Sequence, residues 1–152
     1  MNKTETRALW RSLCACTCKP GTHAPFDCVC VHDQVIYTTD TYVMHRVEGL
    51  YQSGSVFKAL FGHSVTYIDS VHIFDGILSY NPDKRDFSNT CLYYDPAKIA
   101  LALRPHRAAC SKNMQFHPGR GKCFAPLIIT STIATAYDPI IITTAVKGMR
   151  KA

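Results

Sequence analysis

The succession of strand-forming segments constrains the fold of this chain more than any other feature. From residue 26 onward, short runs rich in β-branched and aromatic residues alternate with turn-forming residues. The runs that we expect to form strands, about eight in all, are Phe26–Val31, Val35–Thr39, Tyr42–Val47, Val65–Ile68, Val71–Tyr80, Asn113–His117, Pro126–Ser131 and Pro139–Val146. Asp75-Gly76 is a strong hairpin signal. The pattern therefore predicts sheet built from about eight strands, with hairpins between neighbouring strands.

Two segments have helical patterns instead. The first is expected from Thr4, as the capping residue, to about Cys16. Its apolar residues recur at helical spacing and form one stripe, consisting of Leu9, Trp10, Leu13 and Cys16. The second helix is expected to have Asp95 as its capping residue and Pro96 at its first position, and to run to about Leu103, because Pro105 should end it. Its stripe is Ile99, Ala102 and Leu103.

Length and composition indicate one α+β domain that spans residues 1–152. Of the 152 residues, 47% are hydrophobic and 18% are charged, which is sufficient for a core and unlike a disordered chain. No linker or internal repeat divides the sequence. We expect two helices packed on antiparallel sheets.

Neither export nor membrane insertion is expected from the sequence. No apolar run approaches the ~20 residues that a membrane helix needs. The first seven residues are polar or charged apart from Met1, and no apolar signal segment follows them. A cytoplasmic protein without a membrane partner is therefore expected.

The charge balance favours a polyanionic partner. Seventeen Lys and Arg against eleven Asp and Glu give a net charge of +6, which attracts nucleic acid. Lys3, Arg7 and Arg11 recur every four residues on one face of the first predicted helix. A solvated surface is the alternative interpretation of this basic row.

The cysteines have the wrong spacing for a zinc knuckle. Five of the eight form a C-x-C-x-C run and a C-x-C pair, whereas a knuckle usually separates its ligands by two residues. Spacing of two suits a strand, so we expect reduced cysteines and no metal. The alternative is a zinc site drawn from Cys14, Cys16, Cys18, Cys28 and Cys30.

Motifs typical of enzymes are missing from the sequence. It contains no nucleophile elbow, phosphate-binding loop, dinucleotide fingerprint or zinc-protease motif, and Gly119–Lys122 is better explained as a turn. His45 and Asp40 could form a base and its orienting group, since both flank one turn. We expect a protein without catalytic residues or cofactor that works by binding.

Three segments, taken in order, resemble the repeated domain of bacterial beta-subunit sliding clamps. Val35–Arg46 is similar to the clamp strand that ends in Ala-Thr-Asp-Gly and continues through an aromatic residue or His, an Arg and a Leu. Here Thr39-Asp40 match, but Thr41 replaces the usual Gly and Val43 the usual Arg. Tyr93–Leu103 resembles the second clamp helix with its preceding strand. The third segment, Ala125–Ile129 with Pro139–Val146, resembles the closing strands but lacks their Met-Pro-Val-like ending.

The resemblance implies a non-enzymatic processivity factor. Clamp domains place two helices inside a ring, where Lys and Arg meet phosphate without reading sequence. It therefore assigns Lys3, Arg7, Arg11, Lys98, Arg104 and Arg107 to duplex DNA. A one-domain chain would have to close a ring of about six copies through its sheet edges. The alternative is a small clamp-fold interaction protein, of viral or mobile-element origin, that binds a polymerase or another replication or host protein.

Overall fold

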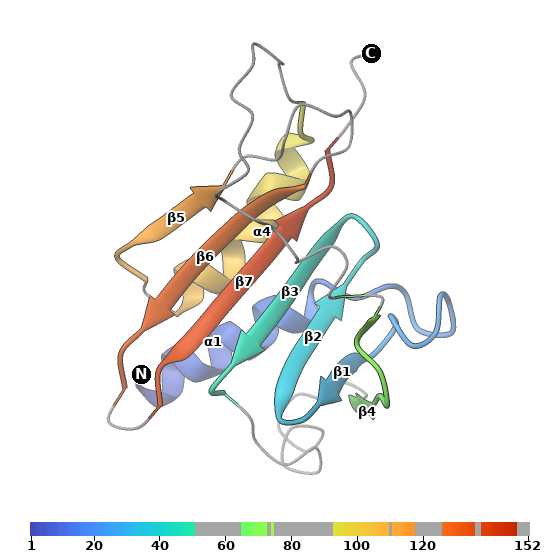
Figure 1. Cartoon of the computed structure of the whole chain (residues 1–152), viewed down its shortest axis with the longest axis horizontal. Coiled ribbons are helices and arrows are strands. Elements are labelled where there is room, and N and C mark those ends of the chain that lie inside the picture. The colour runs from blue at the N-terminus through green and yellow to red at the C-terminus, as the bar shows by residue number, and fades with distance from the viewer. Residues whose placement is uncertain are drawn as a thin grey trace.

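A computed structural model describes residues 1–50, 65–72, 74, 93–109, 111–117, 126–135 and 138–148. Within these residues the fold is α+β, with helices α1 (Lys3–Cys14) and α4 (Pro96–Ala108) lying on one face of a seven-stranded sheet (Figure 1). The strands are β1 (Val29–His32), β2 (Val35–Thr39), β3 (Val43–Glu48), β4 (Val65–Tyr67), β5 (Met114–His117), β6 (Leu127–Ile133) and β7 (Ile140–Val146).

The described strands form one mixed sheet, whereas antiparallel sheets were expected; every described strand pair except β1–β4 is antiparallel. The order is β4-β1-β2-β3-β7-β6-β5, and β4 pairs with β1 in parallel. Two antiparallel meanders, β1-β2-β3 and β5-β6-β7, are joined by the antiparallel pair β3–β7. The register of this central pair runs from Val43 opposite Val146 to Glu48 opposite Ile141.

This strand order gives the described fold a two-part symmetry. Apart from the edge strand β4, each half consists of one helix followed by three antiparallel strands, and the two halves meet at β3 and β7. A two-fold axis between these central strands would exchange the halves. The two helices consequently lie on the same face of the sheet and pack against each other.

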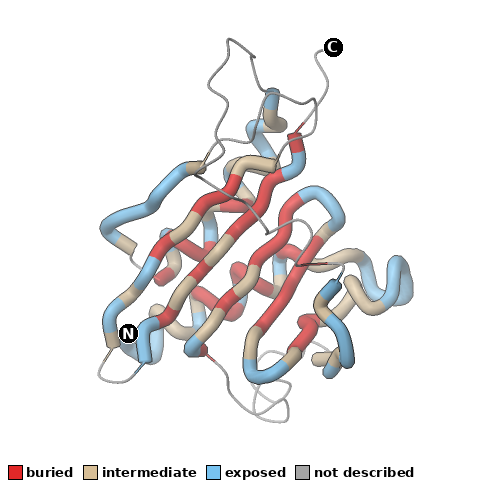
Figure 2. Tube along the Cα trace, in the orientation of Figure 1, coloured by how far each residue is buried: buried red, intermediate tan, exposed pale blue. Residues whose placement is uncertain are grey.

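The core occupies both faces of the sheet. Along β3, Val43 and Val47 point to the helix side, whereas Met44 belongs to a cluster on the opposite side. On that opposite side, Phe74 contacts the rings of Tyr37 and Phe26 at 4.8 and 5.7 Å between centroids. Figure 2 shows that the buried residues concentrate along the central strands, where residues of intermediate burial alternate with them.

Helix α1 is capped two residues earlier than expected. The side chain of Asn2 accepts a hydrogen bond from the backbone N–H of Glu5 at 2.8 Å, and the Glu5 carboxylate binds the backbone N–H of Asn2 in return. This reciprocal capping box replaces the predicted Thr4 cap. The predicted apolar stripe is buried as expected, although Cys16 lies beyond the end of the helix.

Helix α4 continues past the point at which Pro105 was expected to end it. Asp95 caps it as predicted, accepting from the N–H of Ala97 at 2.8 Å, but the helix runs to Ala108. Pro105 is buried in the helix, and its carbonyl accepts a hydrogen bond from Ala109. Packing against the sheet thus outweighs the missing backbone hydrogen bond. As a result, Arg104 and Arg107 are helical residues.

Most predicted strands are present, with shifted ends. Strand 35–39 is confirmed at both ends, but the first strand begins at Val29 because the backbone N–H of Cys28 is used in a turn with Pro25. His72 and Phe74 are helical, so the start of the strand expected over Val71–Tyr80 is wrong. The rest of that strand, the Asp75-Gly76 hairpin and the Gly119–Lys122 turn lie outside the described residues.

Candidate nucleic-acid interface

All six residues assigned to DNA lie on the two helices. Lys3, Arg7 and Arg11 are exposed on α1, and Arg104 and Arg107 are exposed on α4. The capping box starts α1 early enough to include Lys3, and the continuation of α4 beyond Pro105 includes Arg107. Two helices that are more than 80 residues apart in the sequence, since α1 ends at Cys14 and α4 begins at Pro96, therefore present cations in one layer.

Three arginines meet at a hollow between the helices. Arg11 from α1 and Arg104 and Arg107 from α4 line a cavity of about 390 Å³. The remaining lining residues are small, namely Ala8, Ser12 and Ala108. Because the hydroxyl of Ser12 donates to the carbonyl of Leu9 at 2.6 Å, the arginines are the polar groups left to meet a ligand.

The charges of these arginines are not neutralised within the described part of the chain. The ion pairs found there involve His32, Arg46 and Lys98, and none joins a carboxylate to Lys3, Arg7, Arg11, Arg104 or Arg107. A guanidinium keeps its charge at all working pH values and binds phosphate in a bidentate manner. The hollow is therefore suited to anions.

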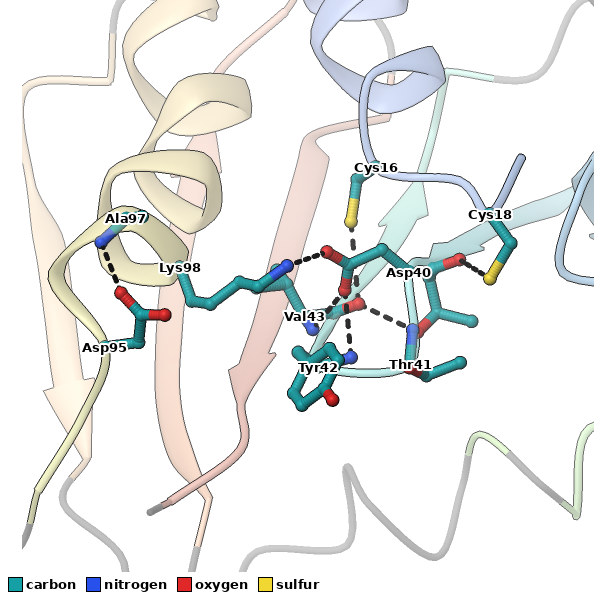
Figure 3. A network of polar contacts seen from close by, with 10 residues as sticks. Cys16, Cys18, Asp40, Thr41, Tyr42, Val43, Asp95, Ala97 and Lys98 are labelled. Atoms are coloured by element: carbon teal, nitrogen blue, oxygen red, sulfur yellow. Dashed lines mark hydrogen bonds and ion pairs between the residues drawn. The ribbon is translucent and has the colours of Figure 1, made fainter. Parts of the chain in front are cut away.

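Lys98 differs from the other predicted contacts because it is already paired. Its Nζ lies 2.6 Å from Oδ2 of Asp40 (Figure 3). Burial opposes ionisation of Asp40, but the hydrogen bond from Lys98 and those from the backbone N–H groups of Val43 and Tyr42 outweigh it and lower the pKa of this carboxyl. The hydrogen bond to Asp40 in turn raises the pKa of Lys98.

Asp40 organises the turn between β2 and β3. Its Oδ1 accepts from the backbone N–H groups of Tyr42 and Val43 at 2.9 and 2.7 Å. The thiols of Cys16 and Cys18 donate to the carbonyls of Val43 and Thr39 at 3.5 and 3.9 Å, which ties the segment after α1 to the same turn (Figure 3). Thr41 has a φ of 80°, a region that disfavours a β-branched residue.

The turn presents one exposed aromatic side chain beside two lysines. Tyr42 is 53% exposed, and the ammonium groups of Lys98 and Lys147 lie 4.9 and 5.6 Å from its ring centroid. The backbone N–H of Lys147 donates to the carbonyl of Tyr42 at 2.9 Å, which fixes the end of β7 against the turn. The sequence did not indicate that Tyr42 and Lys147 meet, because their contact depends on the pairing of β3 with β7.

A buried polar network lies between α4 and the sheet. Nδ1 of His106 contacts the hydroxyl of Ser131 at 2.7 Å, and its Nε2 contacts the hydroxyl of Thr144 at 2.8 Å. The same Thr144 hydroxyl lies 2.7 Å from Nδ1 of His45. Burial lowers the pKa of His106 to about 4, and burial together with the neighbouring His106 lowers that of His45 to about 3. Both imidazoles are therefore neutral near pH 7.

The alternative pairing of His45 with Asp40 is not formed. Asp40 bonds to the turn and to Lys98, whereas the ring of His45 is fully buried and bonds to Thr144. The structure therefore does not bring the two together as a base and its orienting group.

The described cysteines are free thiols: Cys14, Cys16, Cys18, Cys28 and Cys30. Burial raises the pKa of Cys14 and of Cys30 to about 11 and raises that of Cys16 as well. In the ranges that the structure describes, no three His, Cys, Asp or Glu side chains are grouped to hold a metal ion.

No family model, curated protein or solved structure matches this chain. None of the helices in the described ranges is long and apolar enough to cross a membrane.

Proposed function

We propose that this protein binds duplex DNA without reading its sequence, as a clamp-like processivity factor. The observation that carries the proposal is the hollow lined by Arg11, Arg104 and Arg107. Arg11 is far in sequence from Arg104 and Arg107, yet the three line one hollow, and no ion pair joins them to a carboxylate among the described residues.

The shape of the helix layer favours phosphate contacts over base contacts. A helix with its side chains is ~10 Å wide, so the pair α1 and α4 presents a face of roughly 20 Å. The major groove of B-DNA is ~12 Å wide and admits one helix. Two helices packed side by side on a sheet would rest across the groove walls, where their cations meet phosphates.

Sheet-edge association would turn this face into the lining of a ring. Among the described strands, β5 lies at one edge of the sheet and β4 at the other. Met114 and Phe116 of β5 are 36% and 49% exposed, and the strand carries no Lys, Arg, Asp or Glu to discourage pairing. We propose that copies join through these edges with the basic helices facing the DNA, as the clamp resemblance implies.

The test is duplex binding measured by fluorescence anisotropy over a range of salt concentrations. Arg104→Glu with Arg107→Glu should weaken binding equally on unrelated sequences and reduce the slope of log affinity against log salt by about one per lost contact. Lys19→Glu, compared with each single arginine reversal, is the control for a charge change of the same size elsewhere, because Lys19 is exposed in a turn outside the helices. Parental affinity in the arginine variant would reject the helix face as the DNA site.

The exposed residues of β5 also favour a second candidate function. An apolar edge strand can pair with a strand of another protein as readily as with a second copy. The chain would then be a small interaction protein that docks on a polymerase or another replication or host protein. Light scattering separates the two candidates, since a monomer at tens of micromolar that ignores duplex DNA would favour the second.

A further inference from the structure

We infer that Tyr42 and Lys147 form a binding site for single-stranded nucleic acid at the end of the helix layer, where the ring stacks on an unpaired base and the lysine holds the adjacent phosphate. The inference deepens the proposed function and rests on it, because the strand would continue from a duplex held by α1 and α4. It concerns different residues from the arginine hollow.

The charged groups around Tyr42 include one positive charge more than the nearby carboxylate neutralises. Two ammonium groups lie within 6 Å of one ring centroid, but the described turn supplies a single carboxylate, that of Asp40. That carboxylate is taken up by Lys98 and by two backbone N–H groups. Among the described residues Lys147 has no carboxylate partner, so its charge is free to meet a phosphate.

The geometry of the site is held by the backbone and not by the ligand. The carboxylate of Asp40 accepts hydrogen bonds from the backbone N–H groups of Tyr42 and Val43. The carbonyl of Tyr42 accepts a hydrogen bond from the backbone N–H of Lys147. The ring therefore projects from an anchored turn while remaining half-exposed. Both ammonium groups lie over the ring, so a stacking base must displace one of them, and Lys147, which has no carboxylate partner among the described residues, can move from the ring to the adjacent phosphate.

The position of the site relates it to the proposed duplex face. Lys98 belongs to the first turn of α4 and contacts Tyr42, so the site adjoins the N-terminal end of that helix. Arg104 and Arg107 lie six and nine residues further along, roughly 9 to 14 Å away in axial rise. A strand that leaves a duplex on the helix layer can reach Tyr42 within a few nucleotides.

The experiment compares a blunt duplex with the same duplex carrying a single-stranded thymidine extension that contains 2-aminopurine. Parent protein should bind the extended duplex more tightly and quench the 2-aminopurine fluorescence. Tyr42→Ala should abolish the quenching and lower affinity for the extended duplex about tenfold, as expected for one lost stacked base. Its affinity for the blunt duplex should not change.

Three further variants make the test specific. Tyr42→Phe keeps the ring and should bind as the parent does, whereas Lys147→Gln should lower the salt dependence for the extended duplex by about one unit. Lys19→Gln is the matched control for Lys147→Gln, because Lys19 is also an exposed lysine but lies in the turn after α1, outside the strands and helices.

The outcomes separate this inference from the proposed function. If Tyr42→Ala leaves both the quenching and the extension preference intact, or weakens blunt and extended duplexes equally, the inference is wrong. An acidic peptide is the probe for a protein partner. If Tyr42→Ala weakens binding of this peptide but does not affect binding of the extended duplex, the inference is also wrong and the site binds protein. Failure of the Arg104 and Arg107 variant to affect blunt duplex would instead reject the proposed function alone.

Discussion

Nε2 of His106 lies 2.8 Å from the hydroxyl of Thr144, and this contact joins α4 to the central strand β7 through two fully buried side chains. Because the Thr144 hydroxyl also meets Nδ1 of His45 at 2.7 Å, one oxygen serves both imidazoles. A hydroxyl has one proton and can accept further hydrogen bonds, so it can donate to one ring while accepting from the other. Thr144 thereby links the orientations of the two histidines.

Thr144→Val is expected to lower the free energy of unfolding by about 2 kcal/mol. The substitution keeps the shape of the side chain but leaves a buried nitrogen on each histidine without its partner. Urea unfolding is the measurement. Thr143→Val is the matched control, because Thr143 is next to it on β7 but on the opposite face and only partly buried. An equal loss in both variants would show that the shared hydroxyl has no special role.

Acidification should destabilise the protein through the same network. The folded-state pKa values of His45 and His106, about 3 and about 4, lie below the ordinary value of 6.5. The unfolded chain therefore binds more protons below pH 6.5, and stability falls as pH decreases. Asp40 acts in the opposite sense on His45, but less than burial and His106 do. Between pH 7 and pH 5, each histidine should lower the free energy of unfolding by about 2 kcal/mol.

Urea midpoints at the two pH values measure this loss. His106→Gln removes one of the titrating groups and should reduce the pH-dependent loss by about half, whatever its effect on stability at pH 7. A parent protein with equal stability at pH 5 and pH 7 would contradict the expectation.

Two positions with positive φ should respond in opposite directions to substitution. Thr41 has a φ of 80° and is exposed, so Thr41→Gly relieves backbone strain and should raise stability by about 1 kcal/mol. Gly49 has a φ of 82°, and a Cβ there would lie 2.4 Å from the carbonyl oxygen of Pro139. Gly49→Ala should therefore destabilise the fold by more than ~2 kcal/mol. Thermal unfolding compares the two, and a loss of stability in Thr41→Gly would show that the turn is not strained.

Local patterns were sufficient to predict the parts of the fold that local forces decide. The apolar stripe of α1, the cap of α4 and the ends of β2 each depend on residues within a few positions of one another. Pro105 does not end α4 as its local effect predicts, because packing against the sheet stabilises the helix. The β3–β7 pair and the single sheet were also beyond reach, since alternation in a strand does not identify the strand's neighbour.

In the candidate site, too, local sequence patterns predict some features, whereas others depend on tertiary packing. Helical spacing was enough to place Lys3, Arg7 and Arg11 on one face, but the meeting of Arg11 with Arg104 depends on how α1 packs against α4. Similarly, charge counting could not distinguish Lys98, which is paired to Asp40, from the arginines, which are not.

Substitutions in the edge strand β5 should show whether binding to DNA requires assembly through the sheet edge. Met114→Lys with Phe116→Lys places charges on β5, which discourages strand pairing. If copies associate through β5 as proposed, light scattering should show a lower mass for this variant, and each chain should stay folded because both side chains are already exposed. The two added lysines should by themselves strengthen binding to DNA. A loss of DNA binding in this variant would therefore result from lost assembly and not from electrostatics. An unchanged mass would place the contact between copies elsewhere.

Removing the pair of Asp40 and Lys98 together should leave duplex affinity unchanged. Lys98→Ala alone would expose an unpaired carboxylate and repel phosphate, so the double variant with Asp40→Asn is required to keep the net charge constant. The Asn side chain can still accept from the N–H groups of Tyr42 and Val43, so the turn should persist, with a stability loss of about 1 kcal/mol. Arg104→Ala, by contrast, removes a charge that has no carboxylate partner among the described residues, and should lower both the affinity and the salt slope. Anisotropy on one blunt duplex compares the variants directly. If the double variant loses as much affinity as Arg104→Ala, Lys98 contacts phosphate despite its partner, and the ion pair must open when DNA binds.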